Sequence, residues 1–188
     1  MALPWDFHPL EGARVRLDPL RDDADFDALY AIQSDPAVCR YLLYDARSAE
    51  EVAAALERDS AKTRLERVGD YLQPAIRLRD ADDLLIGTMY FHLTSVDDRT
   101  AEIGWLVSPR FQGQGYAREC AEVLLDLAFG ELDLHRVYAE LDPRNTASVR
   151  VCERLGMRRE AHLVEHMWLK GEWTDTGTYG ILEREWRV

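Results

Sequence analysis

Two glycines stand immediately before a helical pattern in the middle of the chain. The residues Gln112, Gly113, Gln114 and Gly115 are followed without a gap by an amphipathic pattern over Tyr116–Glu131. Glycine lets the backbone turn tightly, and the N–H groups at a helix N-terminus attract anions, most often phosphate. We therefore expect either an anion-binding turn or a tight strand-to-helix turn that binds nothing.

Two common phosphate motifs do not fit this turn. The chain has no Gly-Lys-Ser or Gly-Lys-Thr, which excludes a P-loop. A GxGxxG dinucleotide motif starting at Gly113 would end at Arg118, a side chain too large for close helix–strand packing. The turn also follows antiparallel strand patterns instead of opening a βαβ unit. These features disfavour a nicotinamide-dependent oxidoreductase.

A carboxylate within a strand pattern is the first candidate for acid–base chemistry. Strand alternation places Glu102 on one face with Gly104 and Leu106, and Trp105 on the opposite face. A carboxylate near the centre of a sheet needs a partner or a purpose. Glu102 is therefore either a general base that deprotonates an amine, directly or through water, or a structural hydrogen-bonding group.

Aromatic residues are candidates for the wall of a substrate pocket. Tyr41 and Tyr44 lie in the helical region before the sheet, and we expect them to contact the acceptor substrate. Trp168, Trp173 and Tyr179 are further candidates of this kind. Core packing is the alternative for all of them.

Cysteine and histidine spacing indicates no metal site. Cys39, Cys120 and Cys152 are far apart and form no CxxC or Cys/His cluster, so we expect buried thiols in a reducing compartment. The five histidines show no HExxH or HxH spacing.

Hydrophobic periodicity indicates the elements that must position these residues. We predict, in order, a strand at Arg14–Leu17, helices over residues 22–35 and 48–68 with a short helix or turn at 35–45 between them, and strands over 71–80, 84–97 and 100–107. Ser48 and Glu51 form the capping-box pattern of a helix start. The first two of these last strands are joined by a turn at Ala81-Asp82-Asp83. The helix over Tyr116–Glu131 follows, then a strand at 135–141, a helix at 145–156 and a closing hairpin. This order predicts an α/β (α+β) fold: a mixed, mostly antiparallel sheet of about seven strands with helices on both faces.

Length and charge narrow the class of protein. The 188 residues suit a single domain over 1–188, and a net charge of −12 argues against a nucleic-acid partner. No stretch reaches the roughly 20 apolar residues of a membrane span. The first residues lack the pattern of a signal peptide. We therefore expect a cytoplasmic protein without a membrane partner.

The glycine turn resembles a family motif. Gln112, Gly115 and Ala117 match the Q/R-x-x-G-x-G/A motif of the GNAT superfamily of N-acetyltransferases. The segment 142–157, with Asn145, Ser148 and a final Leu-Gly-Met, resembles a second signature of that family. The segments "DPAVCRYL", "SAEEV" and "KGEWTDTGTY" resemble its branch of RimJ/RimL-like ribosomal-protein N-acetyltransferases. The resemblance covers roughly residues 15–186.

This resemblance implies a substrate and a set of binding residues. It implies acetyl-CoA as co-substrate, no metal, and a primary-amine acceptor that attacks the acetyl group directly in a ternary complex. In this branch the acceptor is a protein N-terminal α-amine, and a small-molecule amine is the next expectation. A homodimer is one assembly that it allows. The implied cofactor-binding residues are Leu106, Val107, Gln112, Gly113, Gln114, Gly115, Tyr116, Ala117 and Asn145.

One position departs from the family pattern. Many members carry a tyrosine four residues before the Leu-Gly glycine, as the acid that protonates the departing thiolate, and here that residue is Cys152. The resemblance then points to Ser148, which has this proposed role in the RimJ/RimL-like branch. The substitution also leaves open a non-catalytic acetyl-CoA-binding regulatory module as the alternative. Ser148 could equally be an ordinary first-turn residue, and Asn145 a plain helix N-cap.

Overall fold

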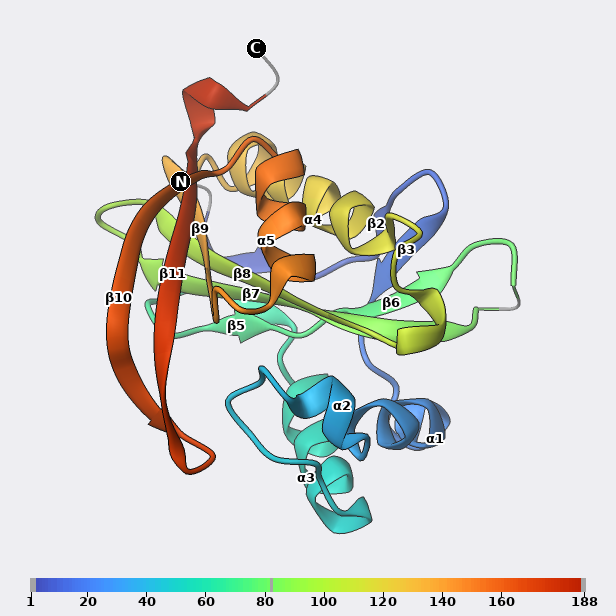
Figure 1. Cartoon of the computed structure of the whole chain (residues 1–188). Helices are drawn as coiled ribbons and strands as arrows, with labels where there is room; N and C mark the ends of the chain where they lie inside the picture. The colour runs from blue at the N-terminus through green and yellow to red at the C-terminus, as the bar shows by residue number, and fades with distance from the viewer. Residues whose placement is uncertain (1–2, 82, 187–188) are drawn as a thin grey trace.

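The computed structural model describes residues 3–81 and 83–186 and contains a mixed sheet with helices on both faces (Figure 1). Nine strands form this sheet in the order β10-β11-β9-β8-β7-β6-β3-β2, with β5 paired to β7. Its members are β2 (Leu10–Glu11), β3 (Val15–Asp18), β5 (Tyr71–Leu72), β6 (Ala75–Leu78), β7 (Leu85–Ser95), β8 (Thr100–Val107), β9 (Arg136–Leu141), β10 (Arg158–Leu169) and β11 (Glu172–Leu182). A separate two-stranded pair joins β1 (Trp5–Asp6) to β4 (Arg64–Leu65).

The seven predicted strands are all confirmed, and the further ones are two residues long. A strand of two residues carries too little periodicity to be predicted from a pattern. One strand prediction was wrong in its bounds, because the predicted strand over 71–80 is divided into β5 and β6 at Gln73 and Pro74. Proline has no N–H to donate to a sheet ladder, so pairing is interrupted there. The predicted turn after β6 includes Asp82, which lies outside the described residues.

The predicted helices are present, and most begin with a side-chain cap. The helix expected over residues 48–68 was too long, because it ends at Ser60 and β4 follows at Arg64–Leu65. They are α1 (Asp22–Gln33), α2 (Pro36–Cys39), α3 (Ala49–Ser60), α4 (Tyr116–Asp126) and α5 (Thr146–Arg154). Asp35 caps α2, Ser48 and Glu51 form the expected capping box on α3, and Asn145 caps α5. The helical path of α4 continues to Glu131 through a wider turn over Leu127–Glu131.

Two apolar cores cover the two faces of the sheet. Helices α4 and α5 lie over one face, and α1, α2 and α3 lie over the other (Figure 1). The larger core contains Phe91, Ile103 and Leu124, all at most 1% exposed. The smaller one packs Leu29 and Val52, from α1 and α3, against Ala75 and Leu85. Burial on both sides holds the central strands rigid, so that they can position side chains accurately.

The central strands separate at one end. Strands β8 and β9 are parallel and pair only from Thr100 with Arg136 to Glu102 with Tyr138. On its other side β8 stays paired with β7 as far as Val107, opposite Gly87. The β9-facing edge of β8 beyond Glu102 therefore borders an opening in the sheet.

Candidate active site

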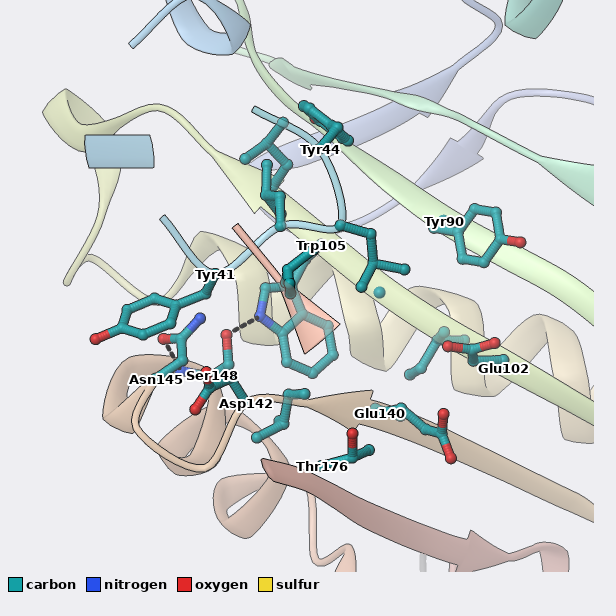
Figure 2. A pocket seen from close by; sticks show the side chains of 18 of the residues that line it. Tyr41, Tyr44, Tyr90, Glu102, Trp105, Glu140, Asp142, Asn145, Ser148 and Thr176 are labelled. Carbon is teal, nitrogen blue, oxygen red and sulfur yellow. Dashed lines mark hydrogen bonds between the residues drawn. The ribbon is translucent and has the colours of Figure 1, made fainter. Parts of the chain in front are cut away.

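A cavity of about 450 Å³ lies at the separation of β8 and β9 (Figure 2). Residues from both faces of β8 line it, including Glu102 and Leu106 from one face and Trp105 from the other. Residues from both faces of β8 can line the cavity because it passes through the gap between β8 and β9. The rest of its wall comes from the α2–α3 connection, β7, β9, the start of α5 and the β10–β11 hairpin.

The glycine turn brings the chain from the end of β8 into α4. Gly113 and Gly115 have φ values of 74° and 87°, in the left-handed region that favours glycine. The Gln112 side chain folds back and donates to the Val107 carbonyl at 2.8 Å. Gln114 likewise donates to the Arg110 carbonyl at 3.2 Å. These contacts give the turn its shape without filling the space in front of the helix.

The N-terminus of α4 has no side-chain cap, unlike those of α2, α3 and α5. Gly115 is its N-cap, and the first helical hydrogen bond runs from the Glu119 N–H to the Gly115 carbonyl at 3.0 Å. The N–H groups of Tyr116, Ala117 and Arg118 precede that bond, so they are free of helical partners. With the positive end of the helix dipole, they form an anion-binding position.

Arg14 removes an obstacle to anion binding at this position. Glu119 lies in the first turn of α4, where its charge would repel a phosphate. Arg14 pairs with it through Nε at 2.8 Å and through its backbone N–H at 2.6 Å. The Arg14 guanidinium also donates to the Gln114 carbonyl at 3.2 Å and lies 4.6 Å from the centre of the Tyr116 ring. Arg14 therefore both neutralises Glu119 and braces the turn.

Glu102 has the properties of a base that works near neutral pH. Its side chain is 26% exposed and lines the cavity, with His92 Nδ1 3.8 Å from its carboxylate. Burial raises the pKa of Glu102 to about 7, and the negative charge of Glu140 adds to the increase. A carboxylate with this pKa is largely ionised at slightly alkaline pH and holds a proton more strongly than an ordinary glutamate.

Ser148 and Asn145 lie together at the start of α5. The Asn145 side chain accepts from the Ser148 backbone N–H at 3.2 Å, which fixes the first turn. Trp105 Nε1 donates to the Ser148 hydroxyl oxygen at 3.2 Å (Figure 2). Since that bond occupies an acceptor position of the hydroxyl, the Ser148 O–H remains available as a donor toward the cavity.

Cys152 lies one turn after Ser148 but away from the cavity. Its side chain is 0% exposed within the larger core, and burial raises the pKa of its thiol to about 12. All three cysteines are free and buried, as predicted. Cys152 therefore occupies the position of the family's tyrosine as a packing residue.

The predicted aromatic residues divide into two groups. Tyr41 and Tyr44 line the cavity, and burial raises the pKa of Tyr44 to about 12. Trp168 and Trp173 are 60% and 56% exposed on the β10–β11 hairpin, and Tyr179 is buried in the larger core. These last three lie outside the cavity wall, and for Tyr179 the alternative of core packing is confirmed.

Sequence reasoning missed four prominent side chains of the wall. They are Tyr90, Trp105, Glu140 and Thr176 (Figure 2). Tyr90 and Glu140 could have been found, because Tyr90 pairs with Gly104 across β7–β8, and Glu140 is two residues beyond Tyr138, the partner of Glu102. Trp105 could not, since strand alternation places it on the face away from Glu102. Only the opening between β8 and β9 brings both to one cavity.

Two findings concern metals and membranes. Within residues 3–81 and 83–186, no three His, Cys, Asp or Glu side chains gather as a metal-binding group. In the same part of the chain, every helix is too short or too polar to cross a membrane.

Comparisons with known proteins agree with this arrangement. The family model for the acetyltransferase (GNAT) domain matches residues 14–158. The uncharacterized N-acetyltransferase YnaD of Bacillus subtilis is 36% identical over 164 residues, which cover 86% of this chain and 90% of YnaD. The spermidine N(1)-acetyltransferase of Vibrio cholerae is 29% identical over 121 residues, covering 64% of this chain and 70% of the relative.

A solved structure shows the same fold. The crystal structure of a GNAT-family acetyltransferase from Bacillus anthracis superposes with a TM-score of 0.83 at 29% identity, covering 95% of this chain and all of that one. The family match, the relatives and the fold favour an enzyme over a non-catalytic binding module. The chain therefore belongs to the GNAT family of acetyltransferases and is an N-acetyltransferase.

Proposed function

We propose that this protein transfers an acetyl group from acetyl-CoA to a primary amine by direct attack in a ternary complex. The observation that carries the proposal is one cavity lined by both Glu102 and Ser148 at the opening between β8 and β9. One of these residues suits proton removal and the other suits proton donation. Direct attack by an amine needs no nucleophilic side chain, and the nearby thiol, Cys152, is fully buried.

The turn and the cavity suit acetyl-CoA. The N–H groups at the start of α4 would hold its pyrophosphate, together with the turn of Gln112, Gly113, Gln114 and Gly115 and with Tyr116 and Ala117. A Cβ atom placed on Gly113 would meet nothing within 4 Å, so this side of the turn is open to a ligand. Leu106, Val107 and Asn145 would border the pantetheine arm in the β8–β9 opening. The donor supplies the acetyl carbonyl that the amine attacks.

The proton transfers balance around the two side chains. Glu102 takes one proton from the acceptor ammonium, which leaves a free amine that can attack. As the carbon–nitrogen bond forms and the carbon–sulfur bond breaks, Ser148 donates its hydroxyl proton to the departing sulfur. The proton that the nitrogen loses on becoming an amide restores the serine hydroxyl. One proton per turnover leaves through Glu102.

Two kinds of acceptor follow from the resemblances. The RimJ/RimL-like segments favour a protein N-terminal α-amine. The relative from Vibrio cholerae is a spermidine N(1)-acetyltransferase, which favours a small aliphatic amine. The cavity wall supports the small amine, since its volume of about 450 Å³ is shared with the acetyl donor, and Tyr41, Tyr44 and Tyr90 narrow it. Figure 2 shows Tyr41 and Tyr90 on opposite sides of Trp105.

Release of free thiol from acetyl-CoA tests the proposal. The full chain should release thiol with small aliphatic amines, and mass spectrometry should show that the amine has gained one acetyl group. Peptides with free α-amines form the second arm of the panel. Thiol release without an acetylated amine, or no release with any amine, would overturn the proposed function.

A further inference from the structure

The charged side chains in the cavity wall are all acidic. Four carboxylates line it, and Lys, Arg and His are absent from its lining within the described residues. The four are Glu102, Glu140, Asp142 and Asp175. This cavity is the acceptor site of the proposed reaction, and these four carboxylates determine its charge.

Two of the four carboxylates already have close polar partners. Asp142 pairs with Arg144 at 2.6 Å. Asp175 lies 2.6 Å from His162 Nε2 and accepts from the Glu165 backbone N–H at 2.9 Å. Both are therefore satisfied before any substrate binds.

Glu102 and Glu140 differ from these two. Among residues 3–81 and 83–186, neither has a Lys or Arg within 4.0 Å. Glu140 accepts a neutral hydrogen bond from the Thr178 hydroxyl at 3.2 Å. Glu102 has His92 at 3.8 Å, and burial lowers the pKa of that imidazole, which favours its neutral form.

The fold holds these two carboxylates near each other. Glu102 on β8 is in register with Tyr138 on β9, and Glu140 follows two residues later on the same face as Tyr138. Figure 2 shows both carboxylates on one side of Trp105, with Ser148 and Asn145 on the other. Two like charges beside a partly buried cavity repel each other, and a bound cation would relieve that repulsion.

A monoamine and a diamine would interact differently with the carboxylates of Glu102 and Glu140. The reacting ammonium must give its proton to Glu102, and after that step it no longer carries charge. A second ammonium on the same molecule keeps its charge and can stay beside Glu140. Since charge-assisted hydrogen bonds are about twice as strong as neutral ones, the second cation would add binding that a monoamine lacks.

We infer that Glu140 is a specificity-determining residue, and that the acceptor is an aliphatic amine carrying a second cationic group. This inference rests on the proposed function, because it concerns the acceptor of the same reaction. It gives the two carboxylates different tasks: Glu102 removes the proton from the reacting nitrogen, and Glu140 holds the nitrogen that does not react. Tyr90 lies beside Glu102 in the wall and would border the alkyl chain (Figure 2).

Matched amines test this inference directly. Thiol release is measured with 1-aminobutane and 1,4-diaminobutane, and with 1-aminopentane and 1,5-diaminopentane, which differ within each pair by one ammonium. Because Glu140 is exposed to solvent, the diamine should have a kcat/KM higher by about two- to fivefold, chiefly through a lower KM, and added salt should reduce the difference.

The variant Glu140→Gln assigns the effect to one residue. It should remove most of the advantage of the diamine over the monoamine. Because the loss of this charge also lowers the pKa of Glu102, the measurement is the ratio of kcat/KM within each matched pair, which a change in the base affects equally for both amines. Glu140→Asp, which keeps the charge, should retain part of the advantage. Glu153→Gln is the matched control, because it removes one charge from the exposed side of α5, away from the cavity. A thermal melt of each variant checks that the fold is intact.

The outcomes separate this inference from the proposed function. If no amine is acetylated, the proposed function is wrong and the inference falls with it. If amines are acetylated but each pair reacts equally, only the inference is overturned. An advantage of the diamine that Glu140→Gln leaves intact would also overturn it, since the second cation would then be held elsewhere.

Discussion

Burial gives the Glu102 carboxyl two properties at once. The low polarity around it raises its pKa to about 7, which makes it a stronger base than an exposed glutamate. The same environment disfavours the ionised form, so an ionised Glu102 lowers the free energy of unfolding. Function and stability are therefore opposed at this residue, as is common where a charge is kept buried for chemistry.

Glu102→Gln should stabilise the protein at alkaline pH. The native pKa of Glu102 is about 7 against an ordinary value of 4.5, so the native state holds the proton more tightly than the unfolded state. Its contribution to stability consequently falls as pH rises from about 4.5 to 7 and is constant above. Glutamine does not ionise, so the variant does not lose stability in this way. The variant should gain on the order of 1 to 3 kcal/mol at pH 8 and little at pH 5.

Thermal melts of wild type and variant at pH 5 and pH 8 measure this difference. If Glu102 is instead a structural hydrogen-bonding group, Glu102→Gln should lower the melting temperature at both pH values. Glu140→Gln provides a second check, because removing that charge should lower the pKa of Glu102 and shrink the pH-dependent difference.

Glu102→Gln should also lose activity in a pH-dependent way. Without the carboxylate, the acceptor must arrive as free amine, which becomes abundant only near its own pKa. The rate loss should therefore be large near neutral pH and should shrink toward about pH 8 for an α-amine, or toward about pH 10 for an alkylamine. Profiles of kcat/KM against pH for both enzymes measure it. A loss independent of pH would mean that Glu102 only positions the substrate.

Ser148→Ala should lower kcat by about tenfold or more, with acetyl-CoA binding nearly unchanged. The serine hydroxyl is held by Trp105 beside the cavity, so its loss removes a proton donor and little packing. Cys152→Ala is the comparison, because Cys152 is fully buried and its truncation should act on melting temperature. A larger loss of kcat from the cysteine change than from the serine change would reverse these assignments.

At the scale of elements, the order of strands and helices could be predicted, while the opening between them could not. Alternation indicated β8, and the capping signals of Ser48 and Asn145 indicated α3 and α5, because each rests on local chemistry. Where β8 and β9 stop pairing depends on long-range packing. The position of Trp105 in the cavity followed from that separation, so no local pattern contained it.

Gly87 allows β7 to approach β8 closely at the end of β8 that borders the opening. A Cβ atom at this position would lie 2.0 Å from the Leu106 carbonyl oxygen and 3.0 Å from Val107 Cα, which are backbone atoms with little freedom to move. Gly87→Ala should therefore push β8 away from β7 at the residues that border the acetyl donor. We expect a loss of about 1–3 kcal/mol in stability and a fall in kcat/KM for acetyl-CoA.

Gly130→Ala is the control for this change. A Cβ atom there would meet nothing within 4 Å, and the glycine lies in the helical turn after α4. Alanine should be neutral or slightly stabilising at such a site. If Gly87→Ala and Gly130→Ala behave equally in urea unfolding and in acetyl-CoA titrations, the close approach at Gly87 matters neither for stability nor for acetyl-CoA binding.

At the scale of the whole molecule, the two proposed substrate sites differ in charge. The chain has a net charge of −12, and the acceptor cavity carries uncompensated carboxylates. At the donor turn, the carboxylates of α4 are neutralised instead, Glu119 by Arg14 and Glu122 by Arg118 at 2.8 Å each. Backbone N–H groups there can attract an anion in spite of the overall negative charge. The charge distribution thus suits an anionic donor and a cationic acceptor.

Binding of acetyl-CoA should raise the melting temperature of the whole chain. A ligand that binds only the native state at about 100 times its Kd adds about 2.7 kcal/mol, which is roughly 5–10 °C for a protein of this size. NAD should give no comparable shift, because the turn lacks the third glycine of a dinucleotide motif. Gly115→Asp should abolish the acetyl-CoA shift, since it adds a side chain and a negative charge at the N-cap of α4.

Gly171→Asp is the matched control for Gly115→Asp. The φ of Gly171 is 82°, close to the 87° of Gly115, so backbone strain and charge change are similar, but Gly171 lies in the β10–β11 turn. Both variants should melt below wild type without ligand, and only Gly171→Asp should keep the shift. Equal stabilisation by NAD, or a normal acetyl-CoA shift in Gly115→Asp, would contradict the placement of the pyrophosphate at this helix.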